Sequence, residues 1–317
     1  MEFGLHMPTD GPLATPDTLV SLAQRVEALG FSIITAGDHI VTPMNIESAY
    51  PYTRSGRARA RPDGDWLENL TLLAFLAAHT SKVRLLPSVT ILPYRNPVIA
   101  AKIFATIDVL SKGRVIVACG LGWLREEFEA LGAPSFEERG MVADEYLRAF
   151  KELWTSDSPT FEGKYCRFSN IYFEPKPVQK PHPPIWIAGE STPALRRVGQ
   201  LGDGWQPVVN NPKHPLDTAD QVATSLARIH GYAEEAGRDP SKITVAYEAE
   251  WNDEARIVSS GERRAFTGTP EQMTEDINAF EKAGVQYVLW TLPGANMDET
   301  SERIEHIADV VKPGASN

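Results

Sequence analysis

Cysteine is scarce in this chain of 317 residues: only Cys119 and Cys166 are present. Two cysteines cannot build a disulfide framework or a cysteine metal site, so we expect a reducing, cytoplasmic compartment. No apolar run reaches about 18 residues, which excludes a membrane span, and the N-terminus lacks the pattern of a signal peptide. The net charge of −11 argues against a nucleic-acid partner.

Several catalytic signatures are also missing. The sequence has no HxxxH, HxH or CxxC spacing, so we expect no metal site. It has no GxSxG elbow, no GxGxxG fingerprint and no Walker loop. Glu248 and Glu250 are spaced like a glycosidase pair, but the simpler expectation is two exposed carboxylates at a strand end.

What the sequence does contain is a regular alternation of short apolar runs and amphipathic segments, which predicts a (β/α)8 TIM barrel. We expect one domain over residues 1–317, an insertion at about 157–183 between the fourth and fifth strands, and long loops after strands 2 and 7. The predicted strands are 2–7, 31–36, 83–89, 114–120, 183–189, 203–208, 243–251 and 287–293. The predicted helices are 16–29, 66–79, 97–110, 126–154 (broken near 132–135), 192–201, 215–236, 270–283 and 298–311.

Residues 87–123 are the most informative stretch. They predict a strand, a helix and a second strand, and the strands end in Ser88-Val89-Thr90 and in Gly120-Leu121-Gly122-Trp123. Ligands bind beyond the carboxyl ends of parallel strands, so both ends are candidate binding segments. Ala188-Gly189-Glu190-Ser191 ends another strand and opens a helix, which favours a phosphate cradle; ordinary N-capping by Ser191 or Thr192 is the alternative.

His39 is the best candidate for proton transfer, because its side chain titrates near neutrality and follows a strand. We expect the adjacent Asp38 to orient it. His6, Trp66 and Trp205 are expected in the substrate pocket, although such aromatics often serve packing alone. The arginine run at 54–61 is either a solvated loop or an electropositive lid.

These residues resemble the bacterial-luciferase-like superfamily, and in particular its coenzyme F420-dependent branch. The resemblance covers nearly the whole chain. It is carried by Gly37-Asp38-His39, by PSVTILPYRNPVIAAKIFATIDVLSKGR, by VACGLGWLREEFEALG, by PKPVQKPHPPIWIAGES and by ALRRVGQLGDGW.

The resemblance implies residue roles. His39 matches the histidine beside the reactive ring, and Ser88-Val89 matches a non-proline cis peptide behind it. Gly120 to Trp123 match a wall of the cofactor site, and Ala188 to Ser191 match the segment that holds the cofactor phosphate.

The resemblance also implies an F420-dependent oxidoreductase that moves a hydride to or from a C=C, C=N or carbonyl group. An FMNH2-dependent two-component monooxygenase and a non-catalytic flavin-binding barrel are the alternatives. A homodimer and a separate reductase that recycles the cofactor are implied as partners. Trp123 and Pro43 replace a glutamate and a tryptophan of the sugar-phosphate dehydrogenases, so that activity is not expected.

Overall fold

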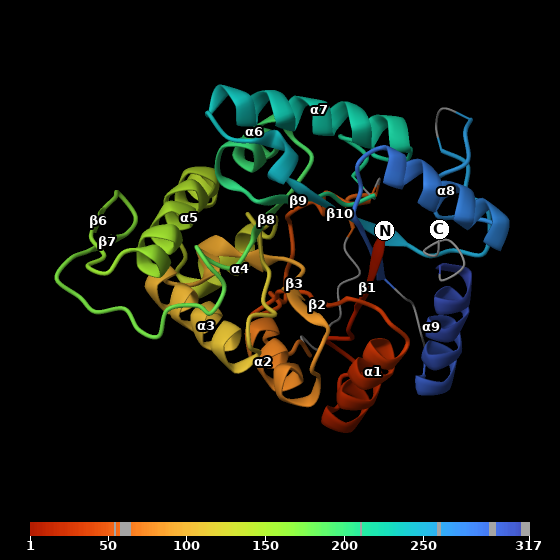
Figure 1. Ribbon diagram of the computed structural model, residues 1–317, viewed down its shortest axis with the longest axis horizontal. Coiled ribbons are helices and arrows are strands. Elements are labelled where there is room, and N and C mark those ends of the chain that lie inside the picture. Colours follow the sequence, from red (N-terminus) through yellow and green to blue (C-terminus); the bar gives the residue numbers. More distant parts are fainter. Residues whose placement is uncertain (54, 58–64, 210, 259–260, 292–295, 312–317) are drawn as a thin grey trace.

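The protein is an α/β barrel with parallel strands inside and helices outside (Figure 1). The structure, a computed structural model, describes residues 1–53, 55–57, 65–209, 211–258, 261–291 and 296–311. Within these ranges the barrel strands are β1 (Glu2–His6), β2 (Ile33–Ala36), β3 (Arg84–Pro87), β4 (Thr90–Ile91), β5 (Val117–Gly120), β8 (Ile185–Ala188), β9 (Gly204–Gln206), β10 (Thr244–Glu250) and β11 (Tyr287–Thr291). The predicted fold class is confirmed.

The sheet closes on itself. Its strands follow the order β3-β2-β1-β11-β10-β9-β8-β5-β4, and each neighbouring pair is parallel. A parallel bridge between Leu85 and Val115 joins β3 to the segment that leads into β5. The third predicted strand, 83–89, corresponds to β3, which ends at Pro87, and β4 follows after Ser88 and Val89, beyond the predicted end. The peptide bond between these two residues is cis, as the resemblance implies.

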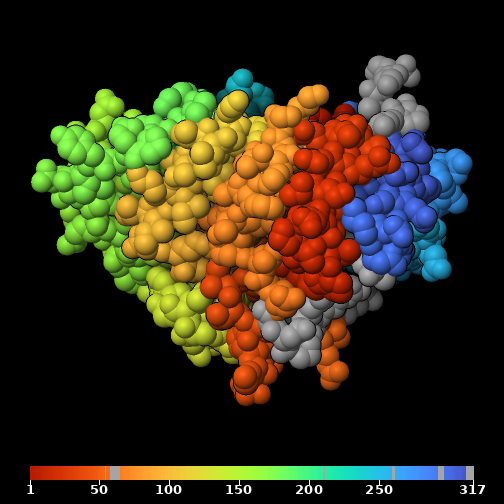
Figure 2. Space-filling view, turned by 90° about the horizontal axis from the view of Figure 1, so that it is seen from below, coloured from red at the N-terminus to blue at the C-terminus, as the bar shows by residue number. Residues whose placement is uncertain are grey.

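The helices cover the outside of this barrel, and the longer ones bury an apolar stripe. In α1, the residues Leu19, Leu22, Ala23 and Val26 are buried at the spacing of one helical face. Figure 2 shows α1 packed between α2 and α9 on one flank. The helices are α1 (Pro16–Ala28), α2 (Asn69–His79), α3 (Pro97–Leu110), α4 (Arg125–Leu131), α5 (Arg139–Thr155), α6 (Thr192–Leu201), α7 (Ala219–Glu235), α8 (Pro270–Lys282) and α9 (Met297–Val311).

Two predicted helix starts were too early, because side-chain caps set the true ones. α2 begins at Asn69 and not at Trp66, since the Glu68 carboxylate accepts the backbone N–H of Thr71 at 2.7 Å. α7 begins at Ala219, because Thr218 and Gln221 form a capping box. The predicted break after α4 is confirmed at Gly132, whose φ of +62° ends the helix.

The insertion between the fourth and fifth barrel strands contains a small antiparallel hairpin, β6 (Phe161–Glu162) and β7 (Arg167–Phe168). The Glu145 carboxylate of α5 docks its turn by accepting the backbone N–H groups of Lys164, Tyr165 and Cys166 at 2.6–2.9 Å. A Cβ at Gly163 would lie 2.2 Å from Glu145 Oε1, so the docking requires glycine there.

Long loops follow β2 and β10, as predicted. Most of the arginine run, Arg54 and residues 58–61, lies outside the described residues. In the part of the chain that the structure describes, no helix has both the length and the apolar character needed to cross a bilayer.

Candidate active site at the mouth of the barrel

The inner face of the barrel changes from apolar to polar toward the carboxyl ends of the strands. Below lie Ile33, Leu86, Ala118, Trp186, Ala246 and Leu289, which form a buried interior cluster together with Ile116. Side chains on one face of a strand recur every second residue, so the next inward layer follows directly. That layer, here called the mouth floor, consists of His6, Thr35, Ser88, Gly120, Ala188, Gln206, Glu248 and Thr291.

Three residues of the mouth floor form a hydrogen-bonded cluster. Ser88 Oγ donates to Glu248 Oε2 at 2.9 Å, and Gln206 Nε2 donates to Ser88 Oγ at 2.8 Å and to Glu248 Oε2 at 3.3 Å. The expectation that Glu248 is a simple exposed carboxylate was therefore wrong. Glu250 instead pairs with Arg256 at 3.1 Å, so the two glutamates do not act as one pair.

His6 lies on the other side of the mouth floor. Its Nδ1 is 2.8 Å from Thr35 Oγ1, and a Cβ on Gly37 would lie 3.7 Å from its Nε2. Burial lowers the pKa of His6 despite the nearby charges of Glu248 and Asp10, so the imidazole is neutral near pH 7.

His39 is held by a buried carboxylate that the sequence did not single out. Its Nδ1 is 2.9 Å from Oε2 of Glu127, a residue of α4 that is 0% exposed. Glu127 also accepts the hydroxyl of Tyr94 at 2.9 Å and the backbone N–H of Ile40 at 2.7 Å. Burial disfavours its charge, but hydrogen bonds from His39 and these neighbours outweigh burial and lower the pKa of Glu127.

Asp38 does not orient His39, contrary to expectation. Its two oxygens accept the guanidinium of Arg95 at 2.7 Å each, and Oδ2 also accepts the backbone N–H of Ile91 at 2.8 Å. A bidentate ion pair in a buried place is a strong structural contact. Asp38 therefore ties the end of β2 to the segment after β4.

Aromatic residues surround the His39 side of the mouth. Trp66, predicted for the substrate pocket, packs against His39 with ring centroids 5.0 Å apart. Trp123 contacts Tyr50 of the loop after β2, again at 5.0 Å, and Tyr50 contacts Tyr52 at 5.5 Å. Trp205 was predicted for the same pocket, but it points away from the barrel interior into the core, is 0% exposed, and donates its indole N–H to the Gly189 carbonyl.

The segment after β5 lies directly on the Ser88–Val89 bulge. A Cβ at Gly120 would be 2.4 Å from Val89 Cγ2, and Gly122, with φ +77°, would meet Phe128 at 2.8 Å. These glycines are therefore required by packing within the chain itself. Leu121 is half-buried beside them, and Thr90 is buried in the β4–β5 pair.

The predicted phosphate segment opens α6. Gly189 has φ +111°, and Ser191 makes no side-chain cap, so capping by Ser191 does not satisfy the first amides of the helix. Thr192 Oγ1 accepts a hydrogen bond from Arg228 of α7 at 2.8 Å, which brings a cation to this helix end.

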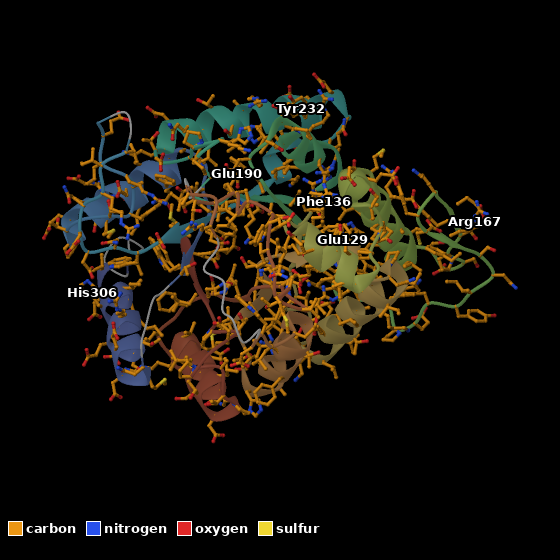
Figure 3. The ribbon with its side chains drawn as sticks, turned by 180° about the vertical axis from the view of Figure 1, so that it is seen from behind. Glu129, Phe136, Arg167, Glu190, Tyr232 and His306 are labelled. Atoms are coloured by element: carbon orange, nitrogen blue, oxygen red, sulfur yellow. The ribbon has the colours of Figure 1, made fainter. Side chains whose placement is uncertain are left out.

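Glu190 turns away from the α6 terminus. Its carboxylate accepts Val208 N–H at 3.0 Å and Asn211 Nδ2 at 2.7 Å, and burial raises its pKa. Figure 3 shows Glu190 inward of the α6–α7 layer, whereas Arg167 lies far from the barrel on the hairpin of the insertion. The repulsion between this carboxylate and a phosphate is reduced accordingly.

The described residues contain no group of three or more His, Cys, Asp and Glu side chains that could bind a metal ion.

Comparison with known proteins identifies the family of this chain. The family model described as luciferase-like monooxygenase matches residues 1–251. An uncharacterized protein of Mycobacterium tuberculosis is 29% identical and covers 88% of this chain and 96% of its own length. An FMNH(2)-dependent dimethylsulfone monooxygenase of Pseudomonas putida is 33% identical over 60% of this chain and 52% of its own.

Solved structures with the same fold include complexes with F420 and with FMN. An F420-dependent secondary alcohol dehydrogenase in complex with an F420-acetone adduct superposes with a TM-score of 0.77 at 20% identity, covering 100% of this chain and 99% of that one. At that identity the likeness concerns the fold. The family match, which spans most of the barrel, shows that the chain belongs to the luciferase-like monooxygenase family of oxidoreductases.

Proposed function

We propose that this protein is an F420-dependent oxidoreductase acting on a C=C, C=N or carbonyl/alcohol group of a small organic substrate. The observation that carries the proposal is the placement of His39 at the mouth, with Nδ1 held by the buried Glu127. A fixed Nδ1 leaves Nε2 as the exchangeable position. Nε2 makes no hydrogen bond within the described part of the chain, so it is free to serve a ligand.

The residues present fit a ring cofactor with a phosphate. The first amides of α6 lack a side-chain cap from Ser191, and Gln206 Oε1 is a buried acceptor without a partner among the described residues. We propose that Ser88, Val89 and Thr90 back the ring, that Gly120 to Trp123 flank it, and that Ala188 to Ser191 hold its phosphate. When bound, F420 supplies a hydride donor or acceptor.

The side chains of this protein then do the remaining work. His39, oriented by Glu127, donates a proton to the reduced substrate atom or takes one from an alcohol, through Nε2. Trp66 and the Trp123–Tyr50–Tyr52 contacts shield the mouth from water. We propose that Asp38, through its ion pair with Arg95, holds the end of β2 in place. We propose that His6 lines the substrate pocket.

The test uses F420H2 oxidation with a panel of ketones, enones and nitroaromatics. We expect His39→Ala to lower turnover about 10²-fold or more, the usual contribution of a proton-transfer group. His214→Ala is the matched control, because His214 is exposed in the loop before α7. Equal turnover by the His39→Ala variant and wild type would exclude a catalytic role for His39. Cofactor binding by wild type without turnover of any substrate would favour a non-catalytic flavin-binding barrel.

A second candidate is an FMNH2-dependent monooxygenase, favoured by the 33% identity to the dimethylsulfone enzyme. It requires oxygen, since reduced FMN reacts readily with O2 and reduced deazaflavin does so poorly. Formation of an oxygenated substrate product with FMNH2 and O2, together with no oxidation of F420H2, would establish it.

We further propose a cytoplasmic homodimer that works with a separate reductase or dehydrogenase. That partner would return the cofactor to the oxidation state that each turnover needs.

A further inference from the structure

The mouth floor contains two hydrogen-bond acceptors that the chemistry above leaves unused. Gln206 is 1% exposed, and its Oε1 is buried without a partner in the described ranges. Glu248 receives both of its hydrogen bonds, from Ser88 and Gln206, on Oε2. Its Oε1 receives none from any described residue, and Glu248 itself is half-buried. The buried Gln206 Oε1 without a donor is costly, and the half-buried carboxylate oxygen beside it is open to a ligand that brings a donor.

The cluster fixes which way these acceptors face. Gln206 Nε2 donates to Ser88 Oγ and to the Glu248 carboxylate. Turning the amide over would place its oxygen against the carboxylate oxygen, which is repulsive. Ser88 is itself held by its own donation to Glu248 at 2.9 Å. The three side chains therefore hold one another in place. The hydrogen bonds among them leave Gln206 Oε1 and Glu248 Oε1 as the acceptors without a donor.

The surroundings favour a neutral, flat donor. His6 is the nearby imidazole, and burial lowers its pKa. Burial, followed by the charges of Glu190 and Glu248 among others, raises the pKa of Tyr52, which keeps its phenol protonated. The remaining mouth-floor positions on β5 and β8 are Gly120 and Ala188, which have almost no side chain. The space beside Gly120 is filled by Val89, and Ala188 contributes only a methyl group.

We propose that Glu248, positioned by Ser88 and Gln206, accepts the imide N–H of the bound ring cofactor. This inference rests on the proposed function, because F420 and FMN both carry a pyrimidinedione ring with one imide N–H between two carbonyls. The half-buried carboxylate of Glu248 would make a charge-assisted hydrogen bond, which is stronger than a neutral one. Glu248 would thus select rings that bear this donor.

Glu248→Gln is the sharpest variant, because it preserves shape and inverts polarity. Ser88 and Gln206 both donate to position 248, so the new amide must offer them its oxygen. Its NH2 group then faces the ligand where an acceptor was. Kd would be measured by fluorescence titration for whichever of F420 and FMN binds wild type, and for the 3-methyl derivative of that cofactor, which lacks the imide N–H.

We expect Glu248→Gln to weaken binding of the parent cofactor at least about tenfold, and binding of the 3-methyl derivative less than about twofold. Glu250→Gln, on the same strand and paired with Arg256, should change neither. Ser88→Ala keeps the carboxylate, loosens its position and should give a smaller loss for the parent. Circular dichroism and Tm would verify that each variant folds.

The outcomes separate the two proposals. Unchanged affinity of Glu248→Gln for the parent, or equal losses for parent and derivative, would overturn the role of Glu248 while the proposed function stands. Failure of wild type to bind either cofactor would overturn the proposed function, and this inference with it.

Discussion

At the scale of single residues, the site depends on which carboxylate meets which partner. Strand-end placement made His39 the candidate for proton transfer, and its orienting acid was predicted to be the sequence neighbour Asp38. The structure instead brings Glu127 from 88 residues away. Nothing in Arg125-Glu126-Glu127 distinguishes that glutamate from the acidic residues common in the first turn of a helix. Only the packing of α4 against the β2 loop selects it.

Glu127→Gln tests this assignment. The amide keeps its volume but loses the charge that Nδ1 and the Ile40 and Tyr94 donors share, so His39 is held less firmly. We expect kcat to fall about tenfold or more, with KM changed by less than about threefold. Glu129→Gln is the control, because Glu129 is exposed on the same helix (Figure 3). An unchanged kcat would refute an orienting role.

At the scale of elements, apolar periodicity predicted the strands and helices, while caps and loop contacts set their ends. Glu27 illustrates a contact that no local pattern reveals. It lies in the last turns of α1, and its carboxylate accepts the backbone N–H groups of Ser81, Lys82 and Val83 at the start of β3. Burial acts against its charge, but these hydrogen bonds outweigh it and lower the pKa of Glu27 to about 2.

Glu27→Gln should therefore destabilise the fold in a pH-dependent way. The folded pKa of about 2 is below the ordinary glutamate pKa of 4.5, so the stabilisation is complete above pH 4.5 and is lost as the pH falls toward 2. At pH 7 we expect a loss of about 1–3 kcal/mol in the free energy of unfolding. Urea unfolding of wild type and variant at pH 7 and pH 3 checks it. A difference that grows on acidification would contradict the account.

At the scale of the whole molecule, the order of elements predicted barrel closure, but the surface pattern was not readable from it. Ile99 and Leu110 of α3 are 59% and 64% exposed, and Ile103 lies between them on the same helical stripe. Phe75 of the adjacent α2 is also exposed. Figure 2 shows the flank where these helices meet. Exposed apolar side chains grouped in this way are typical of an interface, and we assign the proposed homodimer to this flank.

Ile99→Asp should convert the dimer to monomers, because a carboxylate would be buried without a partner. Light scattering after size exclusion would give the mass. Tyr172 of the insertion is 97% exposed, so the control substitution Tyr172→Asp should leave the dimer intact. A monomeric wild type, or a dimeric Ile99→Asp variant, would refute the assignment.

The central claim is that the mouth of this barrel binds a deazaflavin, and equilibrium titration of wild type with F420 and with FMN tests it most directly. Fluorescence quenching reports both ligands under the same conditions. We predict saturable binding of F420, tighter than that of FMN by about tenfold or more. Micromolar binding of FMN with no binding of F420 would contradict the account.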